Sequence, residues 1–142
     1  MRTWVDPIAM VGRRLDDVVI GWHCLGRHQD PAGLWLRFDE QWVEVCTWGD
    51  GSLRFDLCDK PVDSDMAEFG RFEMRPPISA DPLRPLMGWP VVRVRRITWD
   101  GTCVGFVLET SGSSVLLANE ADEVLVSTGE LPRDHVDAVI DE

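Results

Sequence analysis

The sequence Asp6-Pro7-Ile8-Ala9-Met10-Val11-Gly12 occurs twice: it returns as Asp81-Pro82-Leu83-Arg84-Pro85-Leu86-Met87-Gly88, with one residue inserted. From each glycine onward the two copies align at an offset of 76 residues, and from Leu34 onward at an offset of 72. The first copy therefore carries four extra residues between its first and second apolar runs. A duplication of this kind predicts one pseudo-symmetric body built from two similar halves.

The repeat also predicts how the chain is organised. Trp42 to Phe55 aligns with Ser114 to Ser127 without a gap. At 142 residues the chain is large enough to bury one core, whereas each half alone would be marginally stable. We therefore expect a single domain, 1–142, with repeats at about 6–57 and 81–128, a connector at 58–80 and an acidic C-terminal tail at 129–142.

Apolar and polar residues alternate over short runs separated by turn residues, which is the pattern of half-buried strands. The predicted strands are Leu15–Trp22, Leu34–Asp39, Trp42–Trp48, Leu53–Leu57, Val91–Trp99, Val104–Thr110, Ser114–Ala118 and Val124–Ser127. Asp39–Gln41 and Asp100–Gly101 are predicted as tight hairpin turns, and Cys24–Gly33 as a loop. The fold class is therefore mainly β: two four-stranded antiparallel meander repeats that form a pseudo-twofold sandwich or a partly open barrel, with short helical turns.

Helical turns are predicted outside these strands. Asp6–Val11 and Asp81–Met87 each begin with Asp as N-cap and Pro as the next residue, which indicates a short or 3₁₀-like turn. Met66–Met74 in the connector is predicted as a short helix or an edge strand. The tail predicts a last short helix capped by Asp134, with Val136, Val139 and Ile140 on one face.

The formal net charge is −11, and the acidic residues concentrate in the connector and near the C-terminus. A field of that sign repels nucleic acid and anionic membranes and attracts cationic partners. We therefore expect a protein partner, no nucleic acid and no membrane. The composition does not define the oligomeric state.

The composition also bears on the compartment. Residues 1–14 lack the apolar core of a signal peptide, and no run is long enough to span a bilayer. These features predict a cytoplasmic protein with four reduced thiols: Cys24, Cys46, Cys58 and Cys103. Lys60 is the only lysine among fourteen basic residues, and this preference for Arg indicates a GC-rich bacterial coding sequence.

No pattern in the sequence is typical of a catalytic site. His23, Cys24 and His28 form the only dense group of soft metal ligands, but a zinc site needs three or four ligands, and Asp30, Cys46 and Cys58 stand at no recognised spacing from them. There is no nucleophile elbow, and the Gly49–Gly51 segment has the chemistry of a turn rather than of a phosphate loop. We expect a protein that is not an enzyme, without metal or cofactor.

Seven tryptophans and no tyrosine are the strongest departure from average composition. Trp35 lies opposite Leu34, Leu36 and Phe38, and because that trio is the better core, Trp35 is predicted to face outward. Exposed Trp is a frequent anchor in protein interfaces, although these rings also fit a position over the sheet edge or under the connector. The predicted partner-binding residues are Trp35, Trp42, Trp48, Asp50, Asp63, Asp65, Glu120, Asp122 and Glu123.

The repeated order of turn, glycine and strands resembles small duplicated β-rich bacterial proteins of the kind found as immunity or accessory proteins beside polymorphic toxins. The resemblance is carried by Gly12 with Gly88, by Leu34–Asp39 with Val104–Thr110, and by Asn119–Val126. It covers most of the chain, and it implies a stoichiometric inhibitor without chemistry of its own.

Three hypotheses follow from the sequence. The first is an immunity protein that binds a cationic bacterial toxin domain, a nuclease or a nucleic-acid deaminase, and occludes its active site. The alternative is a non-catalytic structural or small-ligand-binding β module whose acidic surface serves solubility. The third is an enzyme or metal protein built around His23, Cys24 and His28.

Overall fold

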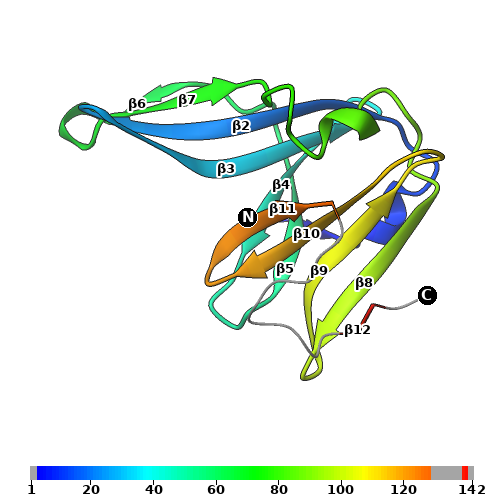
Figure 1. Ribbon diagram of the computed structural model, residues 1–142. Coiled ribbons are helices and arrows are strands. Elements are labelled where there is room, and N and C mark those ends of the chain that lie inside the picture. Colours follow the sequence, from blue (N-terminus) through cyan, green and yellow to red (C-terminus); the bar gives the residue numbers. More distant parts are fainter. Residues whose placement is uncertain (1–2, 129–138, 141–142) are drawn as a thin grey trace.

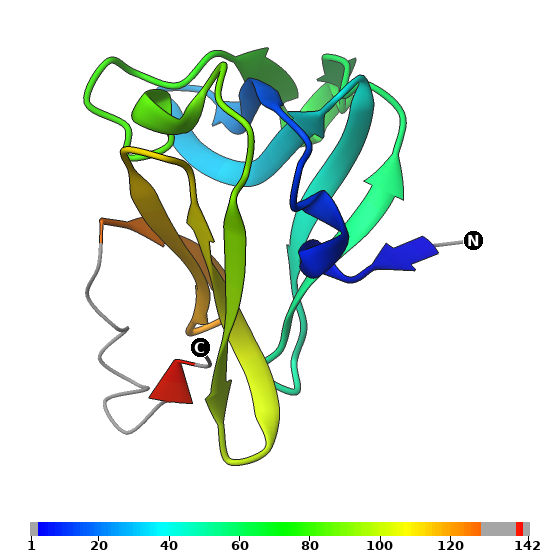
Figure 2. The same ribbon diagram turned by 90° about the vertical axis from the view of Figure 1, so that its right-hand side faces the viewer.

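The computed structural model describes residues 3–128 and 139–140 of a mainly β protein (Figure 1). Its strands form two antiparallel sheets that are not closed into a barrel. Figure 2 shows the sheets side by side: the larger runs from blue to green, and the smaller from lime to orange with a short red strand. The predicted fold class, two antiparallel meanders with short helical turns, is confirmed.

The larger sheet has seven strands in the order β1-β5-β4-β3-β2-β7-β6. Their bounds are β1 Thr3–Val5, β2 Leu15–Leu25, β3 His28–Phe38, β4 Gln41–Thr47, β5 Leu53–Cys58, β6 Ser64–Asp65 and β7 Arg71–Arg75. β2 to β5 are the predicted first meander. The sheet is widened by β1 on one side and by two strands of the connector on the other.

The smaller sheet has five strands in the order β11-β10-β9-β8-β12. Their bounds are β8 Arg93–Trp99, β9 Thr102–Glu109, β10 Ser114–Glu120, β11 Glu123–Ser127 and β12 Val139–Ile140. β8 to β11 are the predicted second meander. The 3₁₀ helices are η1 Pro7–Met10, η2 Ala67–Phe69 and η3 Arg84–Leu86, so the two predicted helical turns of the repeat are confirmed.

The duplication is visible in the strand register. Val18 lies opposite Leu36 in the first hairpin, and their counterparts Val94 and Leu108 lie opposite each other in the second. A register shift, as at a β-bulge, interrupts both hairpins at the same position of the repeat. Because register decides which side chains face the core, both copies bury equivalent positions.

The two copies meet at one crossing of the chain. Gly12 N donates to Val91 O at 2.8 Å, and Gly88 N donates to Leu15 O at 2.7 Å. Each bond is the counterpart of the other at the offset of 76 residues, so a pseudo-twofold axis passes between these segments. The two glycines have φ of 87° and 86°, a conformation that glycine adopts with little strain.

One hydrophobic core joins the sheets. Leu36, Phe38 and Phe55 from the larger sheet are fully buried, as are Leu108 and Leu117 from the smaller sheet. Each sheet alone would leave this apolar face in water, so the burial that stabilises the fold depends on both copies.

The predicted loop at Cys24–Gly33 is wrong. β2 continues to Leu25, and β3 already begins at His28. The four extra residues of the first copy therefore lengthen a hairpin (Figure 1). Pro31 is tolerated inside β3 because this part of the strand pairs with β2 alone and needs no N–H on its other side.

The connector and the tail also differ from expectation. Met66–Met74 contains the 3₁₀ helix η2 and most of β7, which is not an edge strand because β2 pairs with it on one side and β6 on the other. The pairing of β7 with β2 turns the hairpin into a broad arm. Val139–Ile140 form a strand that pairs with β8, so the predicted helix is wrong for these two residues. The rest of that helix, with Asp134 and Val136, lies outside the described residues.

The gapless alignment of the two copies fails at the last strand. Glu44 pairs with Asp56, whereas its counterpart Leu116 pairs with Ser127, one residue earlier than the alignment predicts. The cause is the turn between the strands, since the second copy uses the two-residue turn Ala121–Asp122 with φ of 51° and 65°. The first copy makes a longer turn at 48–52.

Candidate functional site

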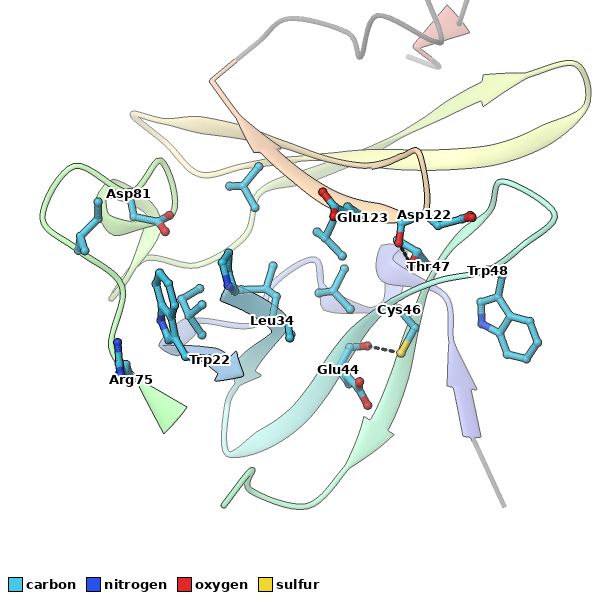
Figure 3. A pocket seen from close by; sticks show the side chains of 18 of the residues that line it. Trp22, Leu34, Glu44, Cys46, Thr47, Trp48, Arg75, Asp81, Asp122 and Glu123 are labelled. Carbon is cyan, nitrogen blue, oxygen red and sulfur yellow. Dashed lines mark hydrogen bonds between the residues drawn. The ribbon is translucent and has the colours of Figure 1, made fainter. Parts of the chain in front are cut away.

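A cleft of about 1060 Å³ lies between the two sheets (Figure 3). Its walls come from β2 and β3, from β4 and the turn after it, from the connector and from β11. The large apolar side chains along it are Ile20, Trp22, Leu34, Val45, Val124 and Val126. Its charged residues are Glu44, Asp81, Asp122, Glu123 and Arg75. Apolar walls and an excess of negative charge therefore occur together.

The cleft exists because β3 separates from β4. β3 pairs with β4 only over Trp35–Phe38, and its remaining residues pair with β2 alone. β4 continues through Val45–Thr47 with β5 alone. Figure 1 shows the result: β2 and β3 run into the arm, whereas β4 and β5 run away from it. In the described part of the chain, no strand joins β3 to β4 over these residues, although Val45 and Cys46 of β4 are buried.

Hydrogen bonds between the sheets hold the far end of the cleft together. Thr47 Oγ1 donates to Asp122 O at 2.8 Å. The Asn119 side-chain amide donates to Trp48 O at 3.1 Å and to Ser52 O at 3.0 Å, and this Asn is only 2% exposed. Because a buried amide is costly to leave unpaired, these bonds fix the turn after β4 against the turn after β10.

Three of the nine predicted partner-binding residues line this cleft: Trp48, Asp122 and Glu123. Trp48 is 41% exposed, as expected for an interface anchor. Asp50 is exposed in the same turn, and Glu120 pairs with Glu123 at the end of the second hairpin. The structure thus gathers five predicted residues around one end of the cleft, and their role in binding stays a prediction.

Trp48 belongs to an exposed aromatic cluster that sequence reasoning missed. Its ring meets Trp4 edge-on at 5.3 Å between centroids, and the Arg54 guanidinium lies 5.1 Å from the Trp48 centroid and 5.4 Å from that of Trp4. Hydrogen bonds from the Ser52 hydroxyl and backbone N–H, with the Arg54 charge, lower the pKa of Asp50. Trp4 was missed because only the pairing of β1 with β5 brings it here.

Trp35 and Trp42 do not form an open surface. Trp35 faces away from the core as predicted, but its ring lies over Gly33 and Gly21 and meets Phe72 edge-on at 6.1 Å. Phe72 is a connector residue, so the ring of Trp35 packs against the connector, which was the alternative to an exposed interface anchor. Trp42 is only 7% exposed, so its ring is not available as an exposed anchor in this structure.

Asp63 and Asp65 lie apart from the other predicted residues. They line a second cavity of about 580 Å³ at the arm, and this cavity shares no lining residue with the cleft. Asp63 Oδ1 accepts from Met74 N at 2.7 Å, and Asp65 Oδ1 accepts from Ala67 N at 2.8 Å. Both carboxylates therefore have a structural use, as acceptors for backbone N–H groups in the connector.

Arg75, the basic residue of the cleft, is already engaged. Its guanidinium lies 5.2 Å from the centroid of Trp22 and forms an ion pair with Glu73 at 2.6 Å. Hydrogen bonding to Arg75 lowers the pKa of Glu73, with Arg71 contributing in the same direction. Since Arg75 is committed to these neighbours, it offsets little of the negative charge elsewhere in the cleft.

The predicted soft-ligand group does not converge. His23 and Cys24 are successive residues of β2 and point to opposite faces of the sheet. His23 Nε2 donates to Phe69 O at 2.7 Å, and His28 is exposed where β3 begins. The four cysteines lie within the described residues, and none of them forms a disulfide.

Another group has the chemistry to hold a soft divalent cation. The ligand atoms of Glu44, Cys46 and Asp56 lie within 4.8 Å of one another on β4 and β5. Sequence reasoning missed this group because only the register places Asp56 opposite Glu44.

Burial, followed by the charges of Glu44 and Asp56, raises the pKa of the nearby Cys58 thiol to about 11.

Comparison with protein-family models, with curated proteins and with solved structures gave no match. The functional conclusion therefore comes from the geometry of this chain alone. Among the described residues, no helix has the length and apolar character to cross a bilayer.

Proposed function

We propose that this chain is a cytoplasmic bacterial immunity protein that binds a cationic toxin domain, a nuclease or a nucleic-acid deaminase, and inhibits it by occluding its active site. The observation that carries the proposal is the cleft at which Trp48, Asp122 and Glu123 converge. It offers apolar area for affinity and negative charge for attraction. The role is a binding role, without chemistry of its own.

The net charge of −11 supports a cationic partner. Enzymes that act on nucleic acids carry basic substrate channels, and an acidic protein is drawn to such a channel by long-range attraction. The aromatic cluster of Trp4, Trp48 and Arg54 then supplies contact area of the kind that dominates interface energetics. Charge speeds the encounter and aromatic burial slows dissociation.

The test is co-expression with the product of the reading frame next to this gene. We expect this chain to restore growth of bacteria that express that product and to inhibit its activity in stoichiometric amounts. The association rate should fall about tenfold or more as salt rises to physiological strength, since surface charges are screened. Absence of a complex, or an association rate that salt leaves unchanged, would contradict the proposal.

A second candidate is a small-ligand-binding module, which the size of the cleft favours. A volume of about 1060 Å³ is close to that of pockets for drug-sized molecules, about 300–1,000 Å³. Screening apolar amines by thermal shift distinguishes the two candidates. Stabilisation by a small amine, with no complex formed by the neighbouring gene product, would favour this module over the inhibitor.

A further inference from the structure

We infer that Glu44, Cys46 and Asp56 form a binding site for one soft divalent cation, with Zn²⁺ as the ion that fits best, on the outer face of β4 and β5. The ion would join the two strands through their side chains. This inference does not rest on the proposed function, because the site needs no partner protein.

The first observation is that the two strands place all three ligands on one face. Val45 of β4 and Phe55 of β5 are buried in the core between the sheets. Because successive side chains of a strand alternate between faces, Glu44, Cys46 and Asp56 lie on the opposite face. Figure 3 shows Glu44 and Cys46 on the same side of β4, away from the smaller sheet. The ligand atoms of the three residues lie within 4.8 Å of one another.

The donor set selects the class of cation. Zn²⁺ binds cysteine sulfur and carboxylate oxygen, whereas Mg²⁺ and Ca²⁺ take oxygen ligands. Two ligand atoms of a tetrahedral Zn²⁺ lie about 3.3–3.8 Å apart, so side-chain shifts of about 1 Å close the group around one ion. Three protein ligands leave the fourth position of that ion to water.

The second observation is a pair of like charges. Glu44 and Asp56 lie directly opposite each other in the register. Glu44 is half-buried, and Asp56 is only 6% exposed. Carboxylates opposite each other destabilise a sheet, and burial strengthens their repulsion. A divalent cation between them replaces repulsion by attraction. Cys46 joins as a thiolate, and its proton passes to solvent as the sulfur binds the ion.

The third observation concerns orientation and access. Asp56 Oδ1 accepts from Thr3 N at 3.0 Å, so a backbone group of β1 helps to hold this carboxylate in place. Hydrogen bonds of this kind orient the ligands of metal sites. Glu44 and Cys46 also line the cleft, through which an ion from solvent can reach the group.

The second copy shows that strand pairing does not require these side chains. The counterparts of Glu44 and Cys46 are Leu116 and Ala118, which are both buried, and Leu116 lies opposite Ser127. The same meander thus forms without a carboxylate or a thiol there. Cys46→Ala places the second-copy residue in the first copy, so we expect this variant to fold.

The chain also offers matched controls. Cys58 lies two residues beyond Asp56 on β5, whereas Cys46 lies on the other side of the Glu44–Asp56 pair. Cys58 is therefore not a member of the group, and Cys58→Ser removes a thiol without removing a ligand. Glu68 is exposed in η2, so Glu68→Gln matches the charge change of Glu44→Gln away from the site.

The probe is Zn²⁺, titrated by calorimetry into the full chain after a chelator has removed metal. We expect one ion per chain, without competition from Mg²⁺ or Ca²⁺. Cys46→Ala should weaken binding about hundredfold and Glu44→Gln about tenfold, while Cys58→Ser and Glu68→Gln bind as the parent does. Co²⁺ in place of Zn²⁺ should give a sulfur-to-metal charge-transfer band that Cys46→Ala abolishes and Cys58→Ser keeps.

Unchanged Zn²⁺ binding by Cys46→Ala, or loss of binding by Cys58→Ser, overturns the inference. Weak binding for which Mg²⁺ competes also overturns it, since this shows an adventitious ion on an acidic surface. If Cys46→Ala does not fold, the Co²⁺ band of the parent and the affinity of Glu44→Gln decide. All these measurements use this chain alone, so their failure leaves the inhibitor proposal standing, and failure to bind a toxin leaves the metal site standing.

Discussion

The two copies have matching inner faces and different outer faces. Equivalent outer positions hold Trp35, Glu44 and Cys46 in the first copy and Val107, Leu116 and Ala118 in the second. In the second copy these side chains are buried in a small apolar cluster separate from the main core. The fold therefore needs no charged or thiol side chain at these positions. The difference teaches that the inner faces make the folding contacts that both copies share, while the outer positions of the two copies differ in charge and size.

The first hairpin of each copy, β2–β3 and β8–β9, also differs between the copies. β2 and β3 are 11 residues each, whereas their counterparts β8 and β9 have 7 and 8. The extra length passes beyond the shared core, pairs with β7 and leaves Val45–Thr47 of β4 paired with β5 and not with β3. Growth of one hairpin thus created the cleft without altering the register that both copies share.

The largest expected effect tests the equivalence of the inner faces. Leu36 and Leu108 occupy the same place in the repeat and are both fully buried. Leu36→Ala and Leu108→Ala should each lower the free energy of unfolding by about 3–4 kcal/mol, because each leaves a cavity in the common core. Urea unfolding measures both values. A cost confined to one copy would show that the copies do not contribute equally to the core.

The next effect sharpens the contrast between the copies at one glycine. A Cβ on Gly105 would lie 2.3 Å from Leu117 O, a backbone atom that cannot move away, whereas one on the equivalent Gly33 would lie 2.5 Å from the ring of Trp35. Gly105→Ala should cost about 3 kcal/mol and Gly33→Ala about 1 kcal/mol, since a side chain can shift. Thermal unfolding of both variants checks the order, and equal costs would contradict it.

A third variant places the second-copy residue in the first copy. Trp35→Val removes the ring that covers Gly33 and meets Phe72, and we expect it to cost about 2 kcal/mol. In this background the penalty of Gly33→Ala should disappear, because its obstacle is gone. Urea unfolding of the double-mutant cycle measures that coupling. Trp89→Val is the control, since this exposed ring should matter by less than about 0.5 kcal/mol.

The smallest effect concerns the outer face in alkaline solution. Burial and the neighbouring carboxylates raise the pKa of Cys58 from its ordinary 9.0 to about 11. The folded state therefore keeps this proton while the unfolded state loses it, and stability should fall as pH rises from 9 towards 11. Cys58→Ser should remove that part of the alkaline loss. Unfolding midpoints against pH for both proteins provide the measurement, and parallel profiles would refute the expectation.

Strand order and the composition of the core could be predicted because they depend on local alternation. Leu34, Leu36 and Phe38 were assigned to the core by period alone, and all three are buried. The tight turn predicted at Asp39–Gln41 was predictable too, since polar residues separate two apolar runs there. In the structure the turn is made by Asp39 and Glu40, whose φ of 46° and 72° are those of a two-residue hairpin turn.

The arm and most of the cleft could not be predicted, because they depend on pairings between distant residues. Gly26, Pro31 and Gly33 favour a loop when taken locally, yet β7 pairs with β2 and stabilises an extended hairpin there. The burial of Trp42 likewise follows from how the elements pack, which alternation within its own strand does not reveal. Trp48 was found because a turn signal adjoins it, and turn signals are local.

The crossing of Gly12 with Val91 and of Gly88 with Leu15 has a consequence for synthesis. When Cys58 leaves the ribosome, the first meander is complete, but the strands that cover its apolar face are not. β10, with Leu117, emerges roughly 3–12 s later at a translation rate of about 5–20 residues per second. During that interval the nascent chain presents Leu36 and Phe55 to its surroundings, as a temporary client for chaperones.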